Sequence, residues 1–495
     1  MTQRLVCAFF ALLLVGSLAC SMVTGLLERQ PGVSAEPGPA ESFAPPSRAP
    51  SQIACSLYVA ADGDDGNPGS EASPWRTLQY AADTAEAGST VCLRQGTYQE
   101  GDTITFTRSG DAGAPITFAA APGETVTLEG SLYVNEGVSH LNIMGLIVQG
   151  FHYWGVSLQG NNEHIVFSGL EVIGGEVGIH LTEGESGQPP SNGPVTDVVI
   201  EDSVIHDAEG PGVDCTPGPC IQTVFRRLEI YGSGLAAGYG GDGIGLERGR
   251  DVVVEDCYIH DNGGDGIDLN SRDFDGNVPG IIVRRNIVAR NHLQGIKLWA
   301  GGRMENNVVW GQGVNAVMVG KFPCTVEMIN NTIAYNMYDP AFSERDYAFV
   351  AAYPEENGPP SVDLILINNI FAYNTGPEVG DPTGIYLGPG ITLTESHNLY
   401  WSREDGEIQA DFVHGHDVWF TRAEISDGTW AQYSGQGKND LGMDPLFLAG
   451  WPEFDFHLNQ ASPAVGAGLS DGAPSDDLDG CARGAPPGIG ASEGC

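Results

Sequence analysis

Three aspartates and one lysine fall at related positions in a short repeated string. Asp242 and Asp265 begin DGIGL and DGIDL, Asp268 lies inside the second string, and Lys297 holds the corresponding position in QGIKL. Clustered carboxylates supply the oxygen ligands that Ca²⁺ prefers. A lysine can remove a proton when its surroundings lower its pKa. These residues therefore predict a metal site beside a base, provided that the three strings lie side by side.

Lysine is rare in this chain, which gives Lys297 more weight. The sequence contains three lysines, Lys297, Lys321 and Lys438, against nineteen arginines. Arginine keeps its proton in proteins, whereas lysine can lose it. An alternative remains open, in which Lys297 only neutralises Asp268 at the surface.

A second repeat indicates which elements position these residues. It reads IEDSVI, FRRLEI, VEDCYI, VRRNIV, MENNVV, INNTIA and INNIFA between residues 200 and 372. Short apolar strings that recur about every 20–30 residues, without a helical segment in each repeat, predict an all-β solenoid, a parallel β-helix. In each Gly-Ile-x-Leu strand the position x points outward. Asp268 and Lys297 are then neighbours on adjacent rungs.

Asparagines at aligned positions of this repeat predict an internal ladder. Their amide groups can hydrogen-bond to one another between rungs about 4.8 Å apart. The four predicted members are Asn286, Asn307, Asn331 and Asn369. We expect them to hold the coils together and to have no chemical role.

The charge balance limits the possible partners. The chain has 495 residues and a formal net charge of −42, which argues against nucleic acid and against an anionic membrane surface. The same charge repels an acidic polysaccharide unless a cation lies between them. We expect a monomer.

The N-terminal residues predict export. Arg4 precedes a short apolar run, so residues 1–20 read as a signal peptide. Residues 17–20 (Ser-Leu-Ala-Cys) have the form of a bacterial lipoprotein cleavage box, and a lipid at Cys20 is the one membrane contact we expect. Plain secretion is the alternative. Residues 21–54 read as a flexible tether, which places the protein outside the cell or on its surface.

The remaining chain divides into three predicted parts. Residues 55–100 form an N-terminal cap and first coil, 101–400 a β-helix with an active-site groove, and 401–495 irregular terminal coils and a cap. Ser73 as N-cap and Pro74 in the first helical position predict a short capping helix over the open end of the solenoid.

Eight of the ten cysteines follow Cys20, and an even number in an exported chain suggests disulfides. Proximity in sequence favours the pairs Cys55–Cys92, Cys215–Cys220 and Cys481–Cys495. Cys257 and Cys324 are expected to stay free and buried.

The motifs resemble those of family 9 polysaccharide lyases, which are pectate-lyase-like enzymes with a right-handed parallel β-helix. The similarity extends from YVAADGDDGNPGSEASPWRTLQYA to about residue 320. The resemblance implies calcium binding by Asp242, Asp265 and Asp268, and a catalytic base at Lys297. It also implies β-elimination in a uronate-containing, pectate-like polysaccharide.

One departure from the family pattern bears on the metal site. The family has an aspartate where this chain has Gly264. Asp273 and Asp275 in the following loop are candidates to compensate, and the open alternatives are weaker calcium binding or lost activity. The predicted substrate contacts are Arg272, Trp299 and Arg303.

Two other functions remain open at this point. A polygalacturonase-like glycoside hydrolase on the same fold would use Asp242, Asp265 and Asp268 as acid and base, with one raised pKa and no tightly bound calcium. A non-catalytic surface protein would bind glycans or calcium through the same residues.

Overall fold

The computed structural model describes most of the chain from residue 53 onward. The described residues are 53–182, 184, 191–235, 240–270, 280–336, 349–351, 361–374, 385–388, 390–401, 407–412, 416–450 and 453–494. The predicted signal peptide, Cys20 and nearly all of the predicted tether lie outside them. No helix among the described residues is long and apolar enough to cross a membrane.

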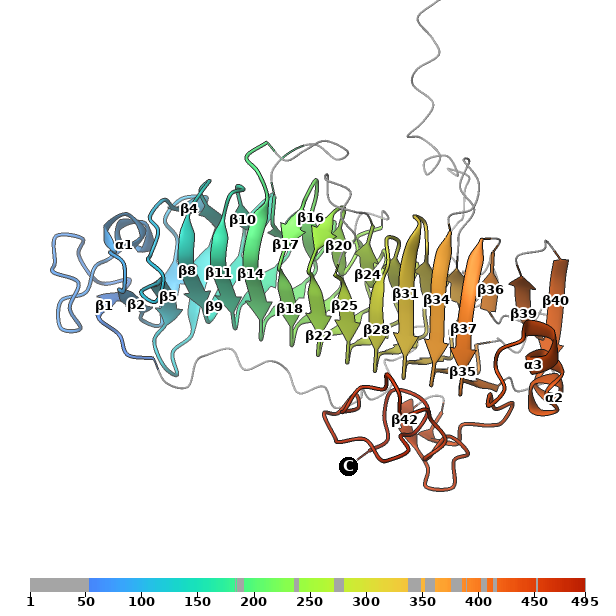
Figure 1. Cartoon of the computed structure of the whole chain (residues 1–495). Coiled ribbons are helices and arrows are strands. Elements are labelled where there is room, and N and C mark those ends of the chain that lie inside the picture. The colour runs from blue at the N-terminus through green and yellow to red at the C-terminus, as the bar shows by residue number, and fades with distance from the viewer. Residues whose placement is uncertain are drawn as a thin grey trace, which may run out of the picture. The chain divides into compact units, whose positions relative to one another are not determined.

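Three parallel sheets wind around one core, coil after coil (Figure 1). The first sheet contains β1 (Leu57–Val59), β2 (Thr90–Leu93), β5 (Ile116–Ala120), β8 (Ser139–Met144), β11 (Glu163–Ser168), β14 (Val195–Glu201), β17 (Cys220–Ile221), β18 (Val224–Arg226), β21 (Gly249–Arg250), β22 (Val253–Glu255), β25 (Ile282–Arg284), β28 (Gly302–Glu305), β31 (Cys324–Ile329), β34 (Val362–Ile367) and β37 (Ile391–Ser396). The second sheet contains β4 (Thr103–Phe106), β7 (Ser131–Val134), β10 (Trp154–Leu158), β13 (Val177–His180), β16 (Val213–Cys215), β20 (Ile244–Leu246), β24 (Ile267–Leu269), β27 (Ile296–Leu298), β30 (Val317–Val319), β33 (Phe349–Ala351) and β36 (Ile385–Leu387). The third sheet contains β3 (Gly96–Tyr98), β6 (Val126–Glu129), β9 (Leu146–Gln149), β12 (Glu171–Ile173), β15 (Val204–His206), β19 (Glu229–Tyr231), β23 (Tyr258–His260), β26 (Ile287–Ala289), β29 (Val308–Trp310), β32 (Thr332–Ala334), β35 (Ile370–Ala372) and β38 (Leu399–Trp401). The predicted right-handed parallel β-helix is confirmed.

Apolar side chains at matching positions of successive coils fill the interior. On the second sheet, Ile244 pairs in register with Ile267, and Ile267 with Ile296. These three side chains are fully buried. Because side chains alternate between the two faces of a strand, the residue between each isoleucine and the following leucine faces outward.

The internal asparagine ladder is confirmed. The amide of Asn286 donates to Oδ1 of Asn307 over 3.0 Å, and Asn307 donates in turn to Asn331 over 2.9 Å. The residue before each ladder position turns the corner with a positive φ, 51° at Arg285 and 56° at Asn306. These bonds satisfy amides inside the core, which would otherwise cost free energy.

A second ladder, which we did not predict, lies at the following corner. Its members are Asn262, Asn291, Gln312, Asn336 and Asn374. The residues Ile259, His260 and Asp261 lie just before this corner, and Asp261 has a φ of 52° there. Asp261 is therefore a turn residue.

The capping helix differs from the prediction in where it begins. It is α1 (Leu78–Thr84), and Thr77 is its N-cap, whose side chain accepts a hydrogen bond from the amide of Tyr80. Ser73 and Pro74 precede the helix in extended backbone, because Trp75 exchanges hydrogen bonds with Tyr58 and Ala60 beside β1. A pairing with the first strand thus outweighs the N-cap preference of Ser73.

After β38 the chain leaves the solenoid pattern. It forms an antiparallel hairpin of β39 (Glu407–Phe412) and β40 (His416–Thr421), the helices α2 (Arg422–Ser426) and α3 (Thr429–Ser434), and a pair of strands, β41 (Phe447–Ala449) and β42 (Asp455–Leu458). Phe454 stacks on Trp310 of the third sheet, with ring centroids 4.2 Å apart. This segment therefore covers part of that sheet.

The cysteine predictions are largely confirmed. Disulfides join Cys55 to Cys92 and Cys215 to Cys220. Cys481 is also disulfide-bonded, and Cys495, its predicted partner, lies outside the described residues. Cys257 and Cys324 are free, but only Cys257 is buried, so the predicted burial of Cys324 is wrong.

Candidate metal and catalytic site

Three consecutive strands of the second sheet bring the predicted site residues together. Gly245 of β20 pairs with Asp268 of β24, and Asp268 pairs with Lys297 of β27. The three positions form one outward-facing row. Asp242 and Asp265 lie in the bends that lead into β20 and β24. The register of the repeated strings thus places them as expected.

The three carboxylates form one compact group, here called the acidic cluster (Asp242, Asp265 and Asp268). One oxygen of each lies within 4.8 Å of the others. Nζ of Lys297 forms an ion pair with Oδ2 of Asp265 and lies 3.4 Å from Oδ2 of Asp268. The structure therefore places the only lysine of these three rungs directly on the cluster.

Backbone amides hold two of the carboxylates in place. Oδ1 of Asp242 accepts a hydrogen bond from the amide of Asp265 over 2.8 Å, and Oδ1 of Asp265 accepts from the amide of Gln294 over 2.8 Å. Each bond links one coil to the next. The bends between coils therefore fix the spacing of the carboxylates as well as the direction of the chain.

Burial and mutual repulsion shift the acidic pKa values upward. Burial raises the pKa of Asp242 to about 8, with further contributions from the charges of Asp265 and Asp268. Burial also raises the pKa of Asp268 to about 6, although the charge of Lys297 acts in the opposite direction. Concentrated negative charge with little water around it is a state that a bound cation would relieve.

The pKa of Lys297 is shifted in the direction that favours its charged form. Burial by itself lowers the pKa of its ammonium group, but the charges of Asp268 and Asp265 outweigh burial and raise this pKa above its ordinary value. Lys297 is thus held protonated by the same carboxylates that would ligate a metal.

The cluster meets the requirements of a hard cation. Oδ1 of Asp268 is buried and has no hydrogen bond of normal geometry among the described residues. A buried oxygen without a donor is costly, and Ca²⁺ binds carboxylate oxygens at about 2.3–2.6 Å. The donor set of three carboxylates therefore fits Ca²⁺ better than Zn²⁺, which favours nitrogen and sulfur.

Gly264 stands where the resembled family has a fourth aspartate, and it leaves room for the carboxylate of Asp242. A Cβ atom at Gly264 would lie 2.4 Å from Oδ1 of Asp242 and 2.8 Å from the carbonyl carbon of Gly241. The carboxylate of Asp242 occupies the space that a side chain at position 264 would need. Asp273 and Asp275, the suggested replacements, lie outside the described residues.

The three predicted substrate contacts have different positions. Trp299 follows β27, is 7% exposed, and its indole helps to lower the pKa of Asp268. Arg303 lies in β28 of the first sheet, where it binds Glu305 and Glu327, away from the acidic cluster. Arg272 lies outside the described residues. Of the two that the structure describes, Trp299 lies at the cluster and Arg303 does not.

Sequence reasoning missed one neighbour of the cluster. Nδ2 of Asn270 donates to Oδ2 of Asp268 over 3.0 Å. Asn270 directly follows DGIDL, so its place one position after the strand was the available signal. It helps to orient the carboxylate that carries the unpaired oxygen.

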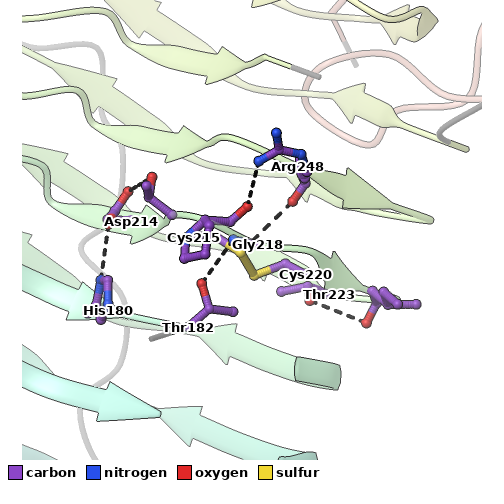
Figure 2. The surroundings of a disulfide bond; sticks show 11 residues. His180, Thr182, Asp214, Cys215, Gly218, Cys220, Thr223 and Arg248 are labelled. Carbon is purple, nitrogen blue, oxygen red and sulfur yellow. Dashed lines mark hydrogen bonds and ion pairs between the residues drawn. A yellow bond between two sulfur atoms is a disulfide. The ribbon is translucent and has the colours of Figure 1, made fainter. Parts of the chain in front are cut away.

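The outward row continues toward the N-terminus with another polar pair. His180 of β13 is in register with Asp214 of β16, and its Nδ1 lies 3.0 Å from Oδ2 of Asp214 (Figure 2). Thr216 also donates to Asp214, over 2.7 Å. Beside this pair, the disulfide Cys215–Cys220 closes the turn after β16.

Comparison with known proteins relates the fold to known β-helices. Residues 57–297 match the family model of the Pel9A-like right-handed β-helix region. Pectate lyase PEL9 of Emericella nidulans is 31% identical over 140 residues, which cover 27% of this chain and 32% of that protein. Pectate lyase L of Dickeya chrysanthemi is 25% identical over 432 residues, covering 83% of this chain and 89% of that protein.

A solved structure supports the same fold. The crystal structure of pectate lyase Pel9A aligns with a TM-score of 0.51 at 19% identity, covering 90% of this chain and 98% of that chain. The resemblance drawn from the motifs is thereby confirmed. Residues 57–297 therefore resemble the Pel9A-like right-handed β-helix region, and the fold of the chain is that of a pectate-lyase-like β-helix.

Proposed function

We propose that the protein is a calcium-dependent polysaccharide lyase that cleaves a uronate-containing, pectate-like polysaccharide by β-elimination. One observation carries the proposal: three carboxylates within 4.8 Å of one another and the Nζ of Lys297 share one outward patch. Pectate lyases among the relatives support the same reaction class.

Asp242, Asp265 and Asp268 would hold the cation. Bound Ca²⁺ would supply positive charge that neutralises a substrate carboxylate and makes the neighbouring ring C–H more acidic. Carboxylates engaged with a cation would no longer hold the proton on Lys297, so its pKa would fall. Nζ of Lys297 would then accept the ring proton. The electron pair left on carbon would form the new C=C bond as the glycosidic C–O bond breaks, and the departing oxygen would take a proton from water.

The test is a screen for unsaturated products. Purified protein is incubated with polygalacturonate, alginate and chondroitin, with Ca²⁺ or with a chelator, and ultraviolet absorbance reports new unsaturated ends. We expect absorbance with Ca²⁺ only. Lys297→Ala should lower the rate about 10²–10⁴-fold, while Lys438→Ala, at an exposed lysine, should leave it unchanged. Full activity in Lys297→Ala would exclude this base.

A hydrolase is the second candidate, because the raised pKa of Asp242, about 8, matches a carboxylic acid that keeps its proton at neutral pH. The spacing speaks against the inverting type, since cluster oxygens lie within 4.8 Å and inverting enzymes separate their carboxyl groups by about 6.5–9.5 Å. New reducing ends without ultraviolet absorbance, insensitive to chelator, would identify a hydrolase. Binding without any cleavage would identify a glycan-binding protein.

An extracellular location fits the proposal. Disulfides such as Cys55–Cys92 persist mainly in oxidising compartments. A lipid on Cys20 remains a proposal, which mass spectrometry of the mature N-terminus would test. The polymer is acidic and the chain has a net charge of −42, so a bound cation would also reduce repulsion between them.

A further inference from the structure

The acidic cluster has one carboxylate fewer than the resembled family pattern. Gly264 stands where that pattern has an aspartate, and the carboxylate of Asp242 occupies the space that a side chain there would need. Three carboxylates remain, whereas Ca²⁺ takes about six to eight oxygen ligands. A cation held there therefore needs further oxygen ligands, from water or from the chain.

Asn270 is held by backbone hydrogen bonds next to the cluster. It directly follows β24, the strand that carries Asp268, and its backbone amide donates to the carbonyl of Leu246 on the preceding coil over 2.9 Å. From the following coil, the amide of Trp299 donates to the carbonyl of Leu269 over 3.2 Å. Both neighbouring coils thus fix the backbone at this position.

The carboxamide of Asn270 reaches the cluster. Nδ2 lies 3.0 Å from Oδ2 of Asp268, the carboxylate whose Oδ1 is buried and has no hydrogen bond of normal geometry among the described residues. In the described part of the chain, nothing donates to Oδ1 of Asn270. A half-turn about the last side-chain bond exchanges Nδ2 and Oδ1. The same group can therefore donate to a carboxylate or present an oxygen to a cation.

The residues at the corresponding positions of the adjacent coils are less suited to this role. Glu247 follows β20 as Asn270 follows β24, and it binds Arg248. Trp299 follows β27 and presents an indole, which has no oxygen. Asn270 combines an uncharged oxygen donor with a direct contact to Asp268.

We infer that the carboxamide oxygen of Asn270 is a ligand of the cation held by the acidic cluster, in place of the missing fourth carboxylate. This inference rests on the proposed function, whose metal site it completes. An amide oxygen binds Ca²⁺ without adding charge, and calcium affinity depends on the number of charged ligands. The site should therefore bind Ca²⁺ more weakly than one with four carboxylates.

The experiment counts the water ligands of a bound lanthanide. Tb³⁺ is a hard cation that occupies calcium sites, and Trp299, beside Asp268, serves to excite it. Luminescence decay rates in H₂O and D₂O give the number of water molecules on Tb³⁺. Asn270→Ala should add one water, because a water molecule takes the place of the lost oxygen. Loss of a side chain that only orients a ligand raises Kd by about 10–100-fold but leaves this number unchanged.

Two further variants make the test specific. Asn270→Asp keeps the shape of the side chain and adds a charge, so it should keep the wild-type number of waters and lower the Kd for Ca²⁺, measured by titration calorimetry. Gln294→Ala is the matched control. Gln294 holds the place in its coil that Asp265 holds in the coil before, but it contacts the cluster through its backbone amide. Its substitution should leave the number of waters unchanged.

Two results would overturn the role of Asn270 as a ligand. One is a number of waters that Asn270→Ala leaves unchanged, and the other is a higher Kd for Ca²⁺ in Asn270→Asp. Calcium-dependent cleavage by the wild type would then leave the proposed function intact. If the wild type binds neither Ca²⁺ nor Tb³⁺, both fail.

Discussion

Two groups of buried carboxyl groups in this molecule have different partners. The acidic cluster lies on the outer face of the second sheet, with Lys297 on it. The other group, here called the cap cluster, consists of Glu395 in β37 and Asp440, which follows α3. Glu395 is 3% exposed and Asp440 is 7% exposed. Both groups gather negative charge out of water, so burial alone does not tell a functional site from a structural one.

The two groups differ in their hydrogen-bond and ion-pair partners. Glu395 accepts hydrogen bonds from the hydroxyl of Tyr400 over 2.6 Å and from the indole of Trp430. Burial and the nearby Asp440 raise the pKa of Glu395 well above its usual range. Neutral donors and a retained proton stabilise Glu395 from within the cap, although Oδ2 of Asp440, like Oδ1 of Asp268, is buried without a hydrogen-bond partner among the described residues. The acidic cluster instead gathers three carboxylates around an ammonium partner, an arrangement that suits an external cation.

Glu395→Ala should have the largest effect on stability. The change leaves Tyr400 and Trp430 without an acceptor and opens a space inside the cap. We expect a loss of about 3–5 kcal/mol in the free energy of unfolding, measured by urea denaturation. Glu395→Gln keeps an acceptor and should lose much less. Lyase activity per folded molecule should not change, and a large change would mean that the cap cluster also serves the reaction.

Calcium should stabilise the protein through the acidic cluster alone. At 100 times Kd, a ligand that binds only the folded state adds about 2.7 kcal/mol to the free energy of unfolding. Asp268→Asn should abolish this gain, because it removes the carboxylate with the unpaired oxygen. Asp440→Asn is the control and should retain the gain. Equal loss of the gain in both variants would contradict the distinction between the two clusters.

Each cluster also packs against a glycine, which allows a matched pair of substitutions. A Cβ at Gly264 would lie 2.4 Å from Oδ1 of Asp242, and one at Gly437 would lie 2.4 Å from Nε1 of Trp430. Overpacking of this kind costs about 1–3 kcal/mol. Gly264→Ala should in addition weaken calcium binding, measured by titration calorimetry, whereas Gly437→Ala should not.

Gly245→Ala is the control for that pair. A Cβ there meets Oδ2 of Asp242 at 3.4 Å, an ordinary contact. The variant should keep both stability and calcium affinity. If it weakens binding as much as Gly264→Ala does, then proximity to the cluster, rather than a clash with Asp242, explains both results.

The sequence predicts the outer site better than the cap. The register of DGIGL, DGIDL and QGIKL follows from a repeat with one outward position in each strand, so Asp268 and Lys297 had to be neighbours. The cap cluster joins Glu395 to Trp430, which are far apart in sequence and belong to no repeat. The start of α1 was wrong for a related reason: Trp75 pairs with β1, a tertiary contact that local helix signals do not contain. Inside the repeat, contacts between residues far apart in sequence could be predicted, because equivalent positions lie side by side. Outside the repeat, such contacts could not be predicted.

The dependence of stability on pH separates the two clusters once more. Folding raises the pKa values of Asp268 and Asp440 to about 6, that of Asp242 to about 8, and that of Glu395 as well. The folded state then binds more protons than the unfolded chain, so the free energy of unfolding falls as pH rises from about 4 to about 8. Each proton contributes at most about 1.4 kcal/mol per pH unit.

Saturating calcium should remove only part of this slope. Carboxylates that ligate a cation stay ionised, so Asp242 and Asp268 no longer take up protons on folding, whereas the cap cluster still does. Glu395→Gln should remove much of the remainder, measured by urea denaturation at successive pH values. Because the raised pKa of Lys297 acts only above its ordinary value of 10.5, that residue does not contribute in this range. A slope that calcium leaves untouched would mean that no cation replaces the protons of the acidic cluster.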